Sequence, residues 1–318
     1  MIHFDLSIVI PCYNSENYIL KCINSAIDEL ENVHVEYIFV NDGSTDRTAE
    51  LIKNFVINDN TKFKLIEQDN KGVSSARNNG IKHCSGKYIM FLDSDDVVIP
   101  NFYGNLLKII EGSEPDLIMG EYVTFNRLED LSLVESEESK NYERDEFLTG
   151  YIYGDLVNNF SVCSSLYKRS FLNNNSLKFD ESLAYAEDQY FLLKCIKLSS
   201  SINISNCKLI AYRQHIGSVT KSFNLKRLQT IDVFERLKGH FPLYESGLDL
   251  RINKELMSIT MFHSRCNTFA KTIDFYKKEI NPNIKNIPKG VDVNLQMFAF
   301  IHFGLLYPIG YKLLKWFR

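Results

Sequence analysis

The stretch YIMFLDSDD at residues 88–96 decides the fold, because five apolar residues run directly into a turn that carries three carboxylates. A strand whose residues are continuously apolar is covered on both faces of its sheet. Similar short apolar runs occur along the first 120 residues, separated by segments with helical spacing: Leu6–Ile10, Tyr37–Val40, Phe63–Ile66 and Asp116–Met119. Strands that alternate with helices predict an α/β fold with a mostly parallel central sheet and right-handed crossovers.

Amphipathic helices are predicted between and after these strands. Apolar residues recur every three or four positions over Ile19–Leu30, and Ser15 stands where a helix N-cap is expected. Further helices are expected at about Ser74–His83 and near Asp188–Leu198, with a strand near Lys208–Tyr212.

The helical spacing continues to the end of the chain, so we expect an α/β domain over 1–220 and a helical region over 221–318. Met297–Tyr311 carries no formal charge, is dense in aromatic residues and is followed by the basic segment KLLKWFR at 312–318. Glycines and a proline argue against a membrane-spanning helix there. The segment fits an amphipathic helix at a membrane surface, and fits equally a helix buried on the body or in an oligomer interface.

Composition excludes some classes of protein. A net charge of −4 and a pI near 6.0 argue against a nucleic-acid partner, which normally requires a basic excess. No two of the seven cysteines have zinc-site or redox-motif spacing, so we expect buried thiols in a reducing compartment. The first residues lack a secretory signal, and we expect the protein on the cytosolic side.

Three polar clusters come directly after three of the predicted strands, at Pro11–Asn14, Asn41–Ser44 and Asp93–Asp96. Each taken alone is ordinary turn chemistry. In a parallel sheet, however, all three turns lie at the carboxyl edge, where ligands of open α/β sheets bind.

The acidic cluster indicates a divalent cation. Its three carboxylates repel one another, and Mg²⁺ or Mn²⁺ relieves that repulsion by taking one or two carboxylates and leaving other positions to phosphate oxygens. The sequence has neither a P-loop nor the glycine fingerprint of a dinucleotide site. A second acidic pair, Glu187-Asp188, opens a predicted helix and is a candidate general base. Acidic residues in the first turn of a helix can also be present only because they interact favourably with the helix dipole.

Five ordered motifs resemble the inverting GT-A-fold family 2 glycosyltransferases, the bacterial capsule, O-antigen and teichoic-acid type. They are residues 7–14 (SIVIPCYN), 40–46 (VNDGSTD), 70–80 (NKGVSSARNNG), 86–96 (GKYIMFLDSDD) and 186–188 (AED). The resemblance implies a catalytic domain over 1–220, with a nucleotide-binding half to about 120 and an acceptor-binding half beyond it. It departs from the processive membrane-embedded synthases, whose Q-x-x-R-W motif and spanning helices are missing here.

The resemblance also implies roles for individual residues. Those expected to bind the nucleotide are Pro11, Tyr13, Asn14, Asp42, Asn70, Arg77, Asp93 and Ser94. Those expected to hold the metal are Asp95, Asp93 and His215, and those expected to face the diphosphate are Arg213 and Ser218. Asp188 resembles the general base, with Glu187 beside it. Asp96 is expected to tune the turn rather than to bind the metal.

The implied activity is transfer of a single sugar, a hexose or N-acetylhexosamine, from a nucleotide sugar to an acceptor hydroxyl of a surface glycan or its lipid-linked precursor. The implied cofactor is Mn²⁺ or Mg²⁺. UDP-sugar is the expected donor, and the inner face of the cell membrane the expected place. Two alternatives stay open: a sugar nucleotidyltransferase, and an inactive partner in glycan assembly.

Overall fold

The computed structural model describes residues 5–30, 34–110, 114–126, 131, 141–153, 159–214, 225–267 and 269–286. These residues form two compact units. The first contains the described residues of 1–147, 157–183 and 187–215, and the second contains those of 148–156, 184–186 and 216–318. The segment at 287–318, with its aromatic and basic end, lies outside the described residues.

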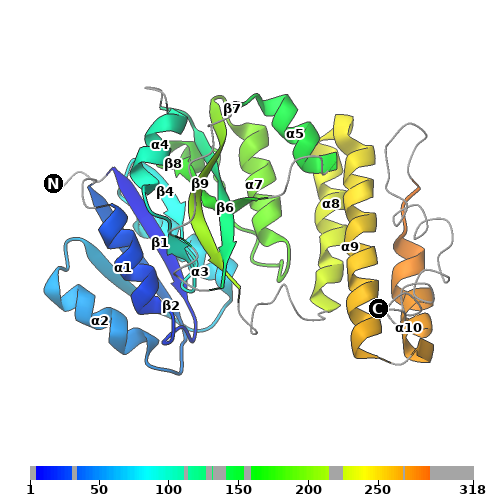
Figure 1. The fold of residues 1–318 in the computed structure, drawn as a ribbon, viewed down its shortest axis with the longest axis horizontal. Helices are drawn as coiled ribbons and strands as arrows, with labels where there is room; N and C mark the ends of the chain where they lie inside the picture. Colours follow the sequence, from blue (N-terminus) through cyan, green and yellow to red (C-terminus); the bar gives the residue numbers. More distant parts are fainter. Residues whose placement is uncertain are drawn as a thin grey trace. The chain divides into compact units, whose positions relative to one another are not determined.

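A single mixed sheet organises the first unit, and within the described residues its strand order is β3-β2-β1-β4-β8-β6-β9-β5, with β7 paired to β9 (Figure 1). The strands are β1 Leu6–Cys12, β2 Val35–Asp42, β3 Phe63–Gln68, β4 Tyr88–Phe91, β5 Val97–Val98, β6 Leu117–Phe125, β7 Asn141–Tyr142, β8 Phe160–Lys168 and β9 Ile202–Arg213.

Helices alternate with the first four strands and cover the sheet. Those that begin in the first unit are α1 Ile19–Glu29, α2 Thr48–Asn58, α3 Val73–His83, α4 Phe102–Ile110, α5 Arg144–Tyr153, α6 Arg169–Asn174 and α7 Glu187–Leu198. α3 packs on β1 and β2, α4 on β9 and α7 on β8 (Figure 1). α5 begins in the first unit and continues into the second after Phe147.

The described part of the second unit is helical. Its elements beyond α5 are the 3-10 turn η3 Leu225–Leu228, α8 Gln229–His240, η4 Pro242–Tyr244, α9 Glu245–Cys266, α10 Phe269–Phe275, the π turn η5 Tyr276–Ile280 and η6 Asn281–Asn283. No helix within the described residues is both long and apolar enough to cross a membrane. The boundary expected at residue 220 stays a prediction.

The α/β prediction is confirmed, and the sheet is parallel from β3 to β4 as expected. Beyond β4 it is mixed, because β8 inserts antiparallel to both β4 and β6. The sequence signal for β8 is weak, since it buries Ser164 and Ser165 where a core strand normally has apolar residues. Both hydroxyls are satisfied locally, since each donates to the Ser161 carbonyl.

The apolar stripe predicted for α1 is confirmed by the burial of Ile19, Cys22, Ile23 and Ala26 against the sheet. Each of the two isoleucine side chains contributes roughly 1.5–3 kcal/mol when removed from water. The capping prediction is wrong, because α1 begins without a side-chain cap. The Ser15 hydroxyl instead lies 2.6 Å from the Ser94 hydroxyl.

Glu36 is a fully buried carboxylate at the amino edge of β2. It accepts five hydrogen bonds: from Ser7 Oγ (2.6 Å), Lys64 Nζ (2.7 Å), the Ser85 amide (2.5 Å) and hydroxyl (2.8 Å), and the Gly86 amide (3.1 Å). Burial by itself would raise the pKa of Glu36, but these donors outweigh it and hold the pKa below its usual range. This network ties β1, β3 and the loop before β4 to β2 at the amino edge.

Glu36→Gln is expected to lower the free energy of unfolding by about 2–4 kcal/mol at neutral pH, because buried donors lose their ionised acceptor. A lowered native pKa adds stability that is present above the unfolded pKa and is lost as the pH falls through the native value. The deficit should therefore shrink in acid. Urea unfolding at neutral and acidic pH measures it, and Glu67→Gln, in an exposed pair with Lys53, serves as the control. Equal losses in the two variants would contradict the prediction.

Candidate active site

The three polar clusters predicted for the carboxyl edge lie side by side and are hydrogen-bonded to one another. The Asn14 side-chain oxygen accepts from the Thr45 backbone N–H (2.9 Å) and hydroxyl (3.3 Å), and the backbone N–H of Asn14 donates to Ser44 Oγ (3.0 Å). The Ser15–Ser94 contact joins the first cluster to the acidic one. The sheet thus brings together three turns that are far apart in the sequence.

The loop after β1 exposes Tyr13 and Asn14 next to the buried end of the strand. Pro11 is buried within the strand, whereas the Tyr13 ring is 52% exposed above the edge. Asn14 has a φ of 49°, in the left-handed region that asparagine tolerates better than most residues. Both side chains are therefore accessible at this edge, and Asn14 also fixes the loop through its bonds to Ser44 and Thr45.

Asp42 anchors the segment that leads into α3. Its carboxylate accepts from Gln68 Nε2 (2.8 Å) and from the backbone amides of Lys71 (2.8 Å) and Gly72 (2.9 Å). Asp42 is only 4% exposed, and its expected contact with a nucleotide base stays a prediction. Asn70, in the same segment, is exposed.

Gly43 is required where this segment meets the turn after β2. Its φ is 71°, and a Cβ added there would lie 2.9 Å from the Asn70 backbone nitrogen. Both the backbone conformation and the close approach therefore exclude larger residues.

A buried guanidinium lies between the two acidic groups. Arg77, on α3, is 4% exposed and donates to Asp93 Oδ1 at 2.8 Å. On its other side, Arg77 Nη1 is 3.5 Å from Glu187 Oε1. Arg77 was expected to bind the nucleotide. In the structure its guanidinium lies beside one carboxylate of the acidic cluster, Asp93, and one carboxylate of the acidic pair of α7, Glu187.

The turn after β4 divides its carboxylates between two directions. Asp93 and Asp95 are half-buried, whereas Asp96 is 2% exposed and accepts from the Arg213 amide at 2.9 Å. Burial, and then the charges of its two neighbours, raise the pKa of Asp96 well above its usual range. Asp96 therefore secures the end of β9, and its expected role in tuning the turn stays a prediction.

Arg213 supports the same turn from β9. Its Nε donates to the Asp95 carbonyl at 2.7 Å, and its guanidinium lies over the rings of Phe125 (4.6 Å) and Tyr18 (5.4 Å). The side chain is buried and holds the backbone of Asp95 in place. Its expected contact with a diphosphate stays a prediction.

Glu187 and Asp188 open α7, as predicted. The preceding residue, Ala186, has a φ of 61°, which is costly for a residue with a Cβ and turns the chain sharply into the helix. Burial, and then the neighbouring Asp188 charge, raise the pKa of Glu187 to about 7, while Arg77 opposes the shift. Burial also raises the pKa of Asp188. Two adjacent carboxyls whose pKa values are both raised are suited to acid–base chemistry.

The donor set fits a hard divalent cation. Within the described residues no group of three or more His, Cys, Asp or Glu side chains could hold a metal ion. Mg²⁺ and Mn²⁺ do not need such a group when phosphate oxygens fill the remaining positions, and two half-buried carboxylates in one turn suffice. His215 and Ser218, expected at the metal and the diphosphate, lie outside the described residues.

The structure adds two residues that the sequence analysis did not single out, Phe179 and Asn78. Both are buried next to Arg77, and they contact each other through the backbone of Phe179. Asn78 belongs to one of the recognised motifs, which was the available signal. A single phenylalanine gives none.

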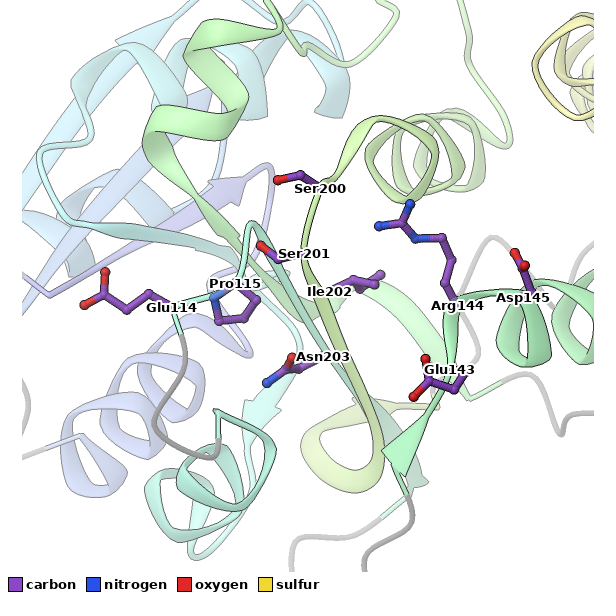
Figure 2. Close-up of a pocket in the computed structure, with 9 residues that line it drawn as sticks. All are labelled: Glu114, Pro115, Glu143, Arg144, Asp145, Ser200, Ser201, Ile202 and Asn203. Atoms are coloured by element: carbon purple, nitrogen blue, oxygen red, sulfur yellow. The ribbon is translucent and has the colours of Figure 1, made fainter.

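A separate polar pocket lies at the opposite edge of the sheet, where β6 and β9 begin. Figure 2 shows Ser200–Asn203 along its middle, with Glu114 and Pro115 on one side and Glu143–Asp145 on the other. Arg144 donates from this side to the Ser199 carbonyl at 2.6 Å. Because β4 and β9 end at the other edge, this pocket shares no residue with the candidate active site.

Comparison with known proteins gives a consistent result. Residues 7–175 match the family model described as glycosyl transferase family 2. The glycosyltransferase GlyA of Streptococcus pneumoniae serotype 4 is 28% identical over 294 residues, which cover 88% of this chain and 41% of that protein. The putative glycosyltransferase EpsH of Bacillus subtilis is 29% identical over 265 residues, covering 81% of this chain and 75% of that protein. This chain therefore spans less than half of the length of GlyA.

Among solved structures, the 1–349 fragment of S. aureus TarS in complex with UDP-GlcNAc superposes with a TM-score of 0.66 at 20% identity. The superposition covers 96% of this chain and 88% of that one. At this level of identity the similarity concerns the fold.

Proposed function

This chain belongs to glycosyl transferase family 2, whose family model matches more than half of it, and we propose that it transfers one sugar, with inversion, from a UDP-sugar to an acceptor hydroxyl. It is a glycosyltransferase with the GT-A fold that its motifs predict. The donor, the acceptor, the metal and the roles of individual residues belong to the proposal.

One observation carries the proposed reaction: Arg77 separates Asp93 from Glu187 by the width of a single guanidinium, at 2.8 Å and 3.5 Å. An inverting displacement needs one group that stabilises the negative charge on the leaving diphosphate. It needs another, on the opposite side of the sugar, that takes a proton from the attacking hydroxyl. The acidic turn after β4 suits the first task, and the acid pair of α7 suits the second.

The residues of the chain divide the work as follows. Tyr13 and the loop that Asp42 anchors bind the nucleobase of the donor. Asp93 and Asp95 would hold Mn²⁺ or Mg²⁺ next to the diphosphate. The bound cation supplies Lewis acidity and neutralises the charge that develops on the leaving group. Asp188 accepts the proton of the attacking hydroxyl, while Glu187 shares the charge of the pair.

The donor and acceptor are proposed by analogy. TarS was crystallised with UDP-GlcNAc and is named a poly(ribitol-phosphate) β-N-acetylglucosaminyltransferase, which supports a UDP-linked hexose or N-acetylhexosamine as the donor. We place the acceptor among surface glycans and their lipid-linked precursors, with the enzyme at the inner face of the membrane through residues 297–318.

The proposal is tested by screening UDP-, GDP- and dTDP-sugars by thermal shift with Mn²⁺, because a donor that binds the native state raises its melting temperature. The stabilising donor is then incubated with candidate acceptors, and the released nucleotide is identified. Release of UDP supports a glycosyltransferase that uses a UDP-sugar. In a parallel assay with UTP and a sugar 1-phosphate, release of pyrophosphate would identify a nucleotidyltransferase. Failure of every donor to bind would favour an inactive partner.

Turnover is expected to fall as the pH drops through about 7, because burial, and then the Asp188 charge, raise the pKa of Glu187 to that value. A raised pKa means that Glu187 takes up a proton at a pH where ordinary carboxyls are still ionised, and loss of its charge makes the adjacent Asp188 a weaker base. The measurement is kcat against pH at saturating donor. A decline that begins only near the ordinary carboxyl pKa of about 4 would contradict the assignment.

A further inference from the structure

Phe179 is a buried aromatic residue that contacts three different elements of the first unit. It lies between α6 and α7 and is 3% exposed. Its ring stacks on Phe191 with a centroid distance of 4.0 Å and an interplanar angle of 10°. Phe91 meets it edge-on at 5.1 Å, and the Arg77 guanidinium lies 5.2 Å from its centroid.

Each of these three neighbours is tied to a residue of the candidate active site. Phe91 ends β4 and stands two residues before Asp93. Phe191 stands three residues after Asp188 in α7, a spacing that places both on one side of the helix. Arg77 bonds Asp93 directly. The Phe179 ring therefore packs against residues that hold the acidic turn after β4 and the Glu187–Asp188 pair of α7 in place.

The backbone of Phe179 is fixed separately by Asn78. The Asn78 amide accepts from the Phe179 N–H and donates to the Phe179 carbonyl, both at 2.9 Å. Asn78 also donates to Glu181 Oε1 at 2.9 Å. Since Asn78 follows Arg77 in α3, the helix that carries the guanidinium also sets the height of the Phe179 ring.

From this arrangement we infer that Phe179 is a positioning residue, anchored by Asn78. It holds the carboxylates of Glu187 and Asp188, at the start of α7, in the correct position relative to the acidic turn after β4. The inference rests on the proposed roles of Asp93 and Asp188, and it assigns Phe179 no contact with substrate. Displacement of a catalytic group by about 1 Å can cost about 10²-fold in rate, so loss of the stack should act on turnover more than on binding.

The test compares Phe179→Leu with Phe63→Leu. Phe63 is also buried and stacked, 5.1 Å from Tyr37, but it stands at the amino end of β3, away from the carboxyl edge. Both variants should lose a similar amount of stability. We expect kcat with UDP-GlcNAc and Mn²⁺ to fall about 10- to 100-fold in Phe179→Leu and by less than about threefold in Phe63→Leu, with UDP affinity little changed in both. A parallel loss of kcat in the two variants, or loss of UDP binding together with kcat in Phe179→Leu, would overturn the inference.

A second pair of variants separates the anchor from its surroundings. Asn78→Ala should reproduce the kcat defect, whereas Glu181→Ala, which removes only the side-chain contact of Asn78, should leave kcat near the wild-type value. A defect of equal size in both would count against the anchor.

Hydrogen exchange keeps the inference testable without turnover. Amides of residues 183–193 should exchange faster in Phe179→Leu than in Phe63→Leu when each is compared with the wild type. Unchanged exchange would overturn the inference even if activity were lost. Faster exchange in a protein whose wild type turns over no UDP-sugar would instead overturn the proposed function and leave the role of Phe179 standing.

Discussion

Asp188→Asn is expected to lower turnover by about 10²–10⁴-fold, the contribution of a positioned general base, and to leave UDP binding nearly unchanged. Asparagine has the same shape, and its oxygen can still accept the Gln189 N–H that Asp188 accepts at 2.7 Å. The start of α7 should therefore stay folded, and only the ability to take a proton is removed. Single-turnover kinetics with saturating donor, together with calorimetry of UDP and Mn²⁺ binding, measure the two quantities.

Glu187→Gln is the matched control for this variant. It removes the neighbouring charge and the ion pair with Arg77 but leaves Asp188 able to accept a proton. We expect a smaller loss of turnover than in Asp188→Asn. Wild-type turnover by Asp188→Asn would remove Asp188 from the mechanism, and a larger loss in Glu187→Gln would transfer the role of the base to Glu187.

The second large effect is expected at the acidic turn, where Asp95→Asn should abolish Mn²⁺-dependent UDP binding and lower turnover by about 10³-fold or more. Loss of a metal carboxylate removes several kcal/mol of stabilisation from the departing diphosphate. Thermal shift with UDP, with and without Mn²⁺, reports binding, and UDP release reports turnover. Retention of the Mn²⁺-dependent shift in Asp95→Asn would contradict the assignment.

Asp96→Asn is the matched control one residue further on. Asparagine keeps the shape of the Asp96 side chain, and burial, which raises the pKa of Asp96 well above its usual range, favours an uncharged group at this position. The asparagine oxygen can still accept the Arg213 amide. We therefore expect binding and turnover within about threefold of the wild type. If Asp96→Asn were as damaging as Asp95→Asn, the turn would have to bind the cation through Asp96 as well.

The parallel half of the fold follows from local signals that can be read in the sequence. Continuous apolar runs define β1 to β4, and helical stripes such as that of α1 define the connections. β8 was not predicted, because its buried serines do not give the apolar pattern of a core strand. Its place between β4 and β6 is set by pairing with strands that are distant in the sequence. The mixed half of the sheet therefore depends on contacts that local patterns do not encode.

The candidate site shows the same division. The ends of the predicted strands indicated that the turns of Asn14, Asp42 and Asp93 lie at the carboxyl edge of the sheet. They did not predict that Arg77 is buried between Asp93 and Glu187, since this requires α3, β4 and α7 to converge. Phe179 shows the limit most clearly, because its importance comes from its neighbours and not from its chemical type.

The hydrogen bonds that join the loop after β1 to the turn after β2 have a consequence for affinity. Asn14 and Thr45 join these two loops through the protein's own groups, and Glu16 adds bonds with Asp46 and Arg47. A nucleotide that binds at this edge contacts loops that folding has already ordered. The entropy of ordering them is then not subtracted from the binding free energy, and preorganisation of this kind strengthens affinity without adding a contact.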